Sequence, residues 1–182
     1  MQEVTINKSA KLSEHLTLSS VAALSHSSEL DGLRLTPHFT LGELCKTSAK
    51  TADGNIPSHV HIENLRRLCG WLEMLRSEWN KRYGEGDDPI IINSGYRSEA
   101  VNKAVGGVKG SNHLTGCAAD IRVAGMEQAL RYAVILLDIS DESREDFDEL
   151  LLERSPKGGY WLHFAVRPPS QENRRKIRFI QT

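Results

Sequence analysis

Three side chains of types that bind metal ions stand in two short motifs of the sequence. His113 and Asp120 lie in the pattern S-x-H-x-x-G-x-A-x-D, and His163 lies in the stretch YWLHFAV. Two imidazoles and one carboxylate are a ligand set that zinc accepts, and three protein ligands leave a position open for water. The motifs therefore predict a hydrolytic zinc site. Their spacing alone also fits a buried histidine with satisfied hydrogen bonds and a solvated aspartate.

The segments around the first motif place two of these side chains. The β-branched run at residues 90–92 predicts a strand, and a glycine-dotted loop, GGVKGSNHLTG, delivers His113. Residues 117–123 alternate as a further strand, with Ala119, Ile121 and Val123 toward the core. Asp120 is therefore expected on the more open face of that strand.

A zinc hydrolase also needs a general base beside the attacking water. Residues 147–153 and 160–166 alternate as two strands, and the short turn-rich link RSPKGG predicts that they pair as a hairpin. This pairing brings Glu153 near His163, so Glu153 is the candidate base. Glu149, two residues earlier on the same face, is the alternative.

Helix signals precede most of the strands. Thr40 begins a capping box that predicts a short helix, and Ser58 is expected to cap a long helix that runs to about Tyr83. One buried stripe of that helix consists of Ile62, Leu65, Leu68, Leu72, Leu75 and Trp79. Residues 126–137 predict another helix, and the acidic stretch after it, residues 138–149, is expected to be a solvated loop.

The order of these segments predicts the fold class. Helices come first, strands follow with one helix between them, and the C-terminal stretch RRKIRFIQT alternates as a last strand. This order is typical of an α+β fold, and we expect a small, mostly antiparallel sheet with helices packed on one side. We divide the chain into an N-terminal arm, residues 1–35, and a domain that carries the predicted zinc site, residues 36–182.

Composition and charge exclude several classes of function. The chain has 182 residues and a net charge of −1, so it can bury one sizeable core but has no general electrostatic attraction to nucleic acid or anionic membranes. No apolar run approaches the length of a membrane span, and the start of the chain has no signal-peptide pattern. The three cysteines have no CxxC spacing, which argues against a disulfide framework.

Other residues whose types could bind a ligand or take part in catalysis have simpler interpretations. His59 and His61 lie two apart in the first turn of the long helix and cannot share a helix face. The glycine loop lacks the spacing of a phosphate-binding loop. Cys117 lies near His113 in sequence, but strand alternation points it away from Asp120, so it is expected to be a small packed residue rather than a nucleophile.

The combined motifs carry a family resemblance. The stretch SGYRSEAVNKAVGGVKGSNHLTGCAAD, followed by WLHFAV, resembles the zinc D-Ala-D-Ala carboxypeptidase family, which shares its fold with the hedgehog signalling domain. The likeness runs from about Phe39 through Val166 and is nearest to the phage- and bacterium-type C-terminal domains of that family. It implies a hedgehog/DD-peptidase fold, one zinc ion per chain, and hydrolysis of peptide bonds in peptidoglycan peptides next to D-alanine.

The resemblance also assigns roles to individual residues. His113, Asp120 and His163 match the zinc ligands of the family. Arg97 matches the arginine of the Y-R-S motif, which contacts a carbonyl or carboxylate of the substrate, a task that suits a permanently charged guanidinium. Glu153 resembles the glutamate that closes the corresponding strand in the hedgehog-type relatives.

Three further residues are expected at the substrate cleft. Ser111 matches the serine two positions before the first histidine, where it either binds substrate or ties down the loop. Trp161 stands where several relatives have a histidine that stabilises the oxyanion, and it is expected to wall the cleft instead. Tyr160 or Arg97 is the candidate for that stabilisation. Many relatives have an acid close before the last histidine, whereas residues 157–160 contain none.

Three functions follow from these observations. The first is a zinc metallopeptidase, either a D,D-carboxypeptidase or an endopeptidase, and the sequence does not distinguish the two. The second is a catalytically inactive zinc-containing module that binds the cell wall, and the third is a phage structural component. We expect a monomer whose partner is a peptidoglycan peptide and not nucleic acid. It would be made in the cytoplasm and reach the wall by an unidentified export or release route.

Overall fold

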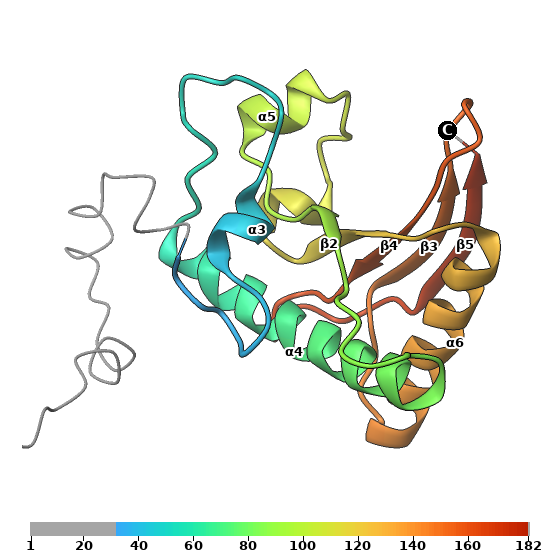
Figure 1. The fold of residues 1–182 in the computed structure, drawn as a ribbon. Coiled ribbons are helices and arrows are strands. Elements are labelled where there is room, and N and C mark those ends of the chain that lie inside the picture. Colours follow the sequence, from blue (N-terminus) through green and yellow to red (C-terminus); the bar gives the residue numbers. More distant parts are fainter. Residues whose placement is uncertain (1–31, 182) are drawn as a thin grey trace, which may run out of the picture.

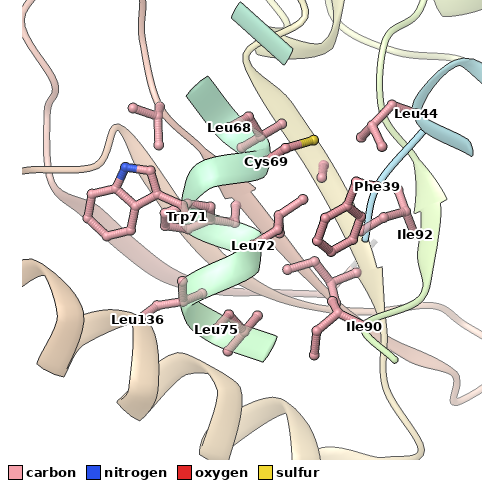
Figure 2. Packing of buried hydrophobic residues seen from close by; sticks show 14 of the residues in the cluster. Phe39, Leu44, Leu68, Cys69, Trp71, Leu72, Leu75, Ile90, Ile92 and Leu136 are labelled. Carbon is pink, nitrogen blue, oxygen red and sulfur yellow. The ribbon is translucent and has the colours of Figure 1, made fainter. Parts of the chain in front are cut away.

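Helix α4 (His59–Arg82) is the element against which most of the core packs. The computed structural model describes residues 32–181. Ser58 caps α4 as predicted: its hydroxyl accepts from the His61 N–H, and the Ser58 N–H donates to His61 Nδ1 at 3.3 Å. The predicted apolar stripe is buried. Figure 2 shows part of it packed against the labelled residues Phe39, Leu44, Ile90 and Ile92.

The segment before α4 closes one end of this core. Helix α3 (Leu41–Cys45) begins after Thr40, whose Oγ1 accepts from the Glu43 N–H at 3.3 Å. Leu35 is buried and belongs to the core cluster. The end of the predicted arm therefore packs on the body, while residues 1–31 lie outside the described residues.

Five strands form one sheet in the order β1-β2-β4-β3-β5. Their bounds are β1 Ile92–Ser94, β2 Ala118–Arg122, β3 Glu149–Arg154, β4 Tyr160–Ala165 and β5 Lys176–Gln181. The predicted hairpin is present, because β3 and β4 pair antiparallel. Strand β5 pairs parallel to β3, so the sheet is mixed rather than mostly antiparallel as expected. The alternation of residue types marks a strand but carries no information about its direction.

The parallel pairing of β5 follows from the path of the chain. After β4 the chain passes the beginning of β3, where the Arg175 N–H donates to the Phe147 carbonyl and the Lys176 N–H donates to the Asp148 carbonyl, both at 2.9 Å. β5 then runs along the outer edge of β3 in the same direction (Figure 1). The last strand is thus placed beside the strand that carries Glu149 and Glu153.

Helix α6 (Met126–Ser143) is longer than predicted. We expected the helix to end near Leu137 and a solvated loop to follow over residues 138–149. The helix instead continues to Ser143, and only residues 144–148 form the connection to β3. Ile139 belongs to the core cluster, so the apolar spacing extends one turn further than the charge pattern indicates. The acidic side chains of this turn lie at the surface, where Asp141 pairs with Arg175.

The sheet has two different faces. Helices α4 and α6 pack against one face (Figure 1), where strand residues Ala119, Ile121, Leu150, Leu162 and Phe164 join the core. Phe147 lies two residues before β3 and is fully buried in the same core. The opposite face carries Asp120, His163, Glu149 and Glu153, and it is not covered by α4 or α6.

Two short elements lie between β1 and β2. Helix α5 (Glu99–Ala104) is capped by Ser98, whose hydroxyl accepts from the Val101 N–H. The 3₁₀ turn η2 (Asn112–Thr115) follows and contacts β2. Among residues 32–181, no helix is long and apolar enough to cross a membrane.

Candidate metal centre

His113, Asp120 and His163 converge at one point on the open face of the sheet. His113 Nε2 lies 3.2 Å from Asp120 Oδ1 and 3.3 Å from His163 Nδ1, and His163 Nδ1 lies 2.9 Å from Asp120 Oδ1. All three residues are buried. Their ligand atoms lie within 4.8 Å of one another, a spacing that suits a single metal ion. The structure thus brings together the three residues that the motifs single out.

The sheet and the η2 turn position these ligands. Asp120 in β2 and His163 in β4 are direct cross-strand partners, so their side chains project from the same face. His113 is held by η2, which ends at Gly116 in the left-handed conformation with φ of 70°. A Cβ at Gly116 would lie 2.6 Å from the His61 carbonyl oxygen, so glycine lets η2 pack directly on α4.

The hydrogen bonds of His113 show that the site fits a cation. Its Nδ1 lies 2.6 Å from the Gly95 carbonyl oxygen. A carbonyl only accepts, so the hydrogen-bond pattern assigns the imidazole proton to Nδ1. Nε2 then directs a lone pair at Asp120 Oδ1, and two acceptors in contact need a positive charge between them. Two imidazole nitrogens and one carboxylate oxygen are the donors that zinc prefers.

The ionisation of the site is suited to holding that charge. Burial favours a protonated Asp120, but His113 and His163 outweigh it and hold the pKa of Asp120 well below its usual range. Burial lowers the pKa of His113. Burial also lowers the pKa of His163, but its contacts with Asp120 and Glu149 raise it to about 9. The site therefore holds an ionised carboxylate and, without metal, a protonated His163.

Arg97 contacts the centre through Asp120. Its Nη2 donates to Asp120 Oδ2, and its Nε donates to Ser94 Oγ at 2.8 Å. Asp120 thus presents one oxygen to the histidines and the other to the guanidinium. The sequence predicts a substrate contact for Arg97, and the structure adds a contact that orients a ligand. Its side chain keeps 16% exposure, so part of the guanidinium stays accessible to solvent.

Asn55 fixes the backbone on both sides of Arg97, a role that no local pattern of residues indicates. Its Nδ2 donates to the Tyr96 carbonyl at 3.1 Å, and its Oδ1 accepts from the Ser98 N–H at 2.7 Å. Asn55 is buried and adopts a left-handed φ of 54°. Asparagine tolerates that conformation, but the turn-rich stretch around it only indicated a loop.

Glu153 lies on the same face as the metal ligands. It is half-buried and stands opposite Trp161 of β4, two residues from His163. Burial raises its pKa; the charges of His163 and Arg97 oppose this shift, and those of Asp120 and Glu149 add to it. A carboxylate with a raised pKa in this position has the properties of a general base. Its assignment as the base stays a prediction.

Glu149, the alternative base, is instead surrounded by donors. Lys176 Nζ lies 2.7 Å from its Oε1, Asn112 Nδ2 lies 3.1 Å from its Oε2, and His163 Nε2 lies 3.5 Å from the same Oε2. Contact with His163 lowers the pKa of Glu149, and Lys176 adds to the shift although burial opposes it. Such a carboxylate is a weak base, so the structure favours Glu153 over Glu149.

The remaining predicted residues are placed differently with respect to the centre. Ser111 caps η2, with its hydroxyl accepting from the His113 N–H at 3.3 Å, so it ties down the ligand loop. Trp161 is half-buried on the metal face of β4, next to Arg122 across the sheet. Tyr160 is also half-buried, at the start of β4, where the Arg154 guanidinium lies 5.7 Å from its ring centroid. Strand alternation places Tyr160 on the face of Leu162, opposite the face that carries His163.

Cys117 is a packed residue in the structure. It is fully buried, and its Sγ lies 3.7 Å from the Thr115 carbonyl. Burial raises the pKa of its thiol, which opposes formation of a nucleophilic thiolate.

Comparison with known proteins agrees with this geometry. The sequence model of the Peptidase M15 family matches residues 37–140, more than half of the chain. The chain belongs to the Peptidase M15 family. The match contains His113 and Asp120, whereas His163 lies beyond it. The predicted resemblance is thereby confirmed, and membership of this family implies zinc at the His-Asp-His site.

A curated relative supports the same family. The chain is 31% identical over 84 residues to the zinc D-Ala-D-Ala carboxypeptidase of Streptomyces albus G. The aligned part is 46% of this chain and 31% of the relative, so the chain matches about a third of that protein. The activity of the relative as a whole is thus a basis for a proposal about this chain.

Proposed function

We propose that this protein is a zinc-dependent hydrolase of peptide bonds in peptidoglycan peptides, acting next to D-alanine. The observation that carries the proposal is the convergence of His113 Nε2, Asp120 Oδ1 and His163 Nδ1 on the sheet face opposite α4 and α6, in a chain of the Peptidase M15 family. The zinc D-Ala-D-Ala carboxypeptidase of Streptomyces albus G supports the substrate class. We propose one zinc ion per chain, because the three ligands form one site.

The residues around the centre divide the chemistry between them. Bound zinc would acidify a water molecule and polarise the substrate carbonyl. Glu153 would accept the proton of the attacking water and deliver it to the leaving amine, and its raised pKa favours both transfers. Arg97 holds Asp120 and would contact a substrate oxygen with its remaining N–H groups.

The substrate would lie along the metal face of β4. Trp161 lies on this face and would contact the peptide through its ring, while Arg97 would donate a hydrogen bond to the developing oxyanion. Tyr160, the other candidate for that role, lies on the opposite face of β4 and is not proposed for it. Ser111 would act through the ligand loop that it caps. Whether a terminal D-alanine or a cross-link is cleaved depends on the loops at residues 47–57 and 154–160. We propose that the protein acts as a monomer and reaches the wall by export or release.

Cleavage of defined muropeptides by the zinc-loaded protein tests this function. Product analysis by mass spectrometry should show loss of a terminal D-alanine or opening of a cross-link. Glu153→Gln should abolish cleavage and retain zinc, whereas Glu99→Gln, which changes an exposed glutamate on α5, should do neither. If the protein binds stoichiometric zinc but cleaves no D-alanine-containing peptide, the proposed peptidase activity is refuted. That result would favour an inactive wall-binding or phage structural module. Full activity of Glu153→Gln would assign the base to another residue.

A further inference from the structure

The outer edge of the His163 ring faces a carboxylate. His163 Nδ1 points to Asp120 and His113, so its Nε2 points away from the centre. Nε2 is buried and has no hydrogen bond of good geometry within residues 32–181. Glu149 Oε2 faces it at 3.5 Å, the outer limit of such a bond. A shift of a few tenths of an ångström would make this contact a hydrogen bond.

The Glu149 carboxylate is fixed by donors from other segments. Its Oε1 contacts Lys176 Nζ at 2.7 Å and Arg174 Nη2 at 3.1 Å, and its Oε2 accepts from Asn112 Nδ2 at 3.1 Å. In the sheet, Glu149 is paired with Ala165 on one side and with Lys176 on the other. The parallel pairing of β5 is thus what brings the lysine to this carboxylate.

The chemistry of a ligating imidazole explains the value of this arrangement. An imidazole that binds metal through Nδ1 carries its proton on Nε2, and that proton needs an acceptor when it is buried. A carboxylate acceptor fixes the ring orientation and makes the ligand nitrogen a stronger donor to the metal. Two cationic neighbours, Lys176 and Arg174, hold the carboxylate ionised and in place. The alternative is that Glu149 only ties β5 to the sheet.

We propose that Glu149 is a positioning residue for the metal ligand His163, and that Lys176 of β5 holds Glu149 in that position. Strand β5 then contributes to the metal centre through Lys176, although it lies beyond the residues that match the family. This inference rests on the proposed zinc site at His113, Asp120 and His163.

Zinc affinity, measured by competition with a chromophoric chelator, tests the inference independently of cleavage. Glu149→Gln should weaken zinc binding by about 10- to 100-fold, as loss of a partner that orients a ligand does. Lys176→Gln should weaken it less, and Lys176→Arg should keep the affinity. The matched control is Arg178→Gln, which changes an exposed residue two positions along the same strand and should leave affinity unchanged.

The double variant separates positioning from strand stability. If Lys176 acts through Glu149, the combined Glu149→Gln and Lys176→Gln variant binds zinc as weakly as Glu149→Gln alone. The visible spectrum of the cobalt-substituted protein should also shift in Glu149→Gln, because the histidine ligand field changes. The inference would be overturned if the losses of zinc affinity in the two single variants added up in the double variant. It would also be overturned if Glu149→Gln kept both the wild-type spectrum and the wild-type zinc affinity.

The outcomes also separate this inference from the peptidase proposal. Wild-type cleavage together with wild-type zinc affinity in folded Glu149→Gln removes the positioning role and leaves the peptidase intact. Weakened zinc affinity in a protein that cleaves no peptide supports the positioning role and removes the peptidase. A wild-type protein that binds no zinc would overturn both.

Discussion

The contact between η2 and α4 can be tested by adding one methyl group at Gly116. This residue ends the turn that carries His113, with φ of 70°, and its Cβ would lie 2.6 Å from the His61 carbonyl oxygen and 3.2 Å from Leu65 Cγ. Neither neighbour is the end of a flexible side chain: one is backbone of α4, and the other is a core leucine. Gly116→Ala must therefore move the turn or the helix.

The expected cost has two parts. The left-handed conformation costs a residue with a Cβ about 1–2 kcal/mol, and forcing an extra carbon into a packed contact costs about 1–3 kcal/mol. Gly106→Ala is the matched control, because Gly106 has φ of 76° but a Cβ at this position would meet no atom within 4 Å. Gly106→Ala should therefore be destabilised only by the cost of the left-handed conformation. The effect of alanine on the unfolded chain is the same in both variants.

Urea unfolding of the zinc-free proteins measures both free energies of unfolding. We expect Gly116→Ala to be less stable than Gly106→Ala by about 1–3 kcal/mol. Its zinc affinity should also fall, since the displaced turn carries His113, whereas Gly106→Ala should bind zinc as the wild type does. Equal stabilities and equal zinc affinities of the two variants would refute a rigid contact between η2 and α4.

Three further predictions concern the metal centre. His113→Ala should lose stoichiometric zinc in equilibrium dialysis, while His38→Ala, at a surface histidine paired with Glu73, should retain it; zinc retained by the first variant would contradict the ligand assignment. Removal of zinc by a chelator should lower the thermal midpoint, since ligand at 100 times its Kd stabilises a fold by about 2.7 kcal/mol; an unchanged midpoint in scanning calorimetry would argue against a zinc ion bound to the folded state. Zinc binding at neutral pH should release a proton from His163, whose pKa of about 9 keeps it protonated without metal, and the release should fade as pH rises above that value. Titration calorimetry in two buffers of different ionisation enthalpy measures the release, and a heat that does not depend on the buffer would contradict it.

Local patterns in the sequence determined much of the centre. The motif around His113 and Asp120 singled out two residues of the candidate metal site, and the period of two in residues 117–123 placed Asp120 on the face away from the core. Thr40 and Ser58 marked the starts of helices correctly, because a capping hydroxyl acts on backbone groups only two or three residues away. These features depend on interactions between residues close in sequence, so they can be predicted from the sequence alone.

The tertiary structure decided which distant residues act together. Alternation shows which face a strand presents but not which strand lies beside it, so the parallel pairing of β5, and with it the contact of Lys176 with Glu149, was not predictable. The same holds for Asn55, whose hydrogen bonds fix the backbone around Arg97 from a segment that indicated only a loop. Local motifs indicated which residues form the candidate metal site. The residues that hold them in place depend on how the chain packs, because hydrogen bonds between distant segments produce no periodic pattern in the sequence.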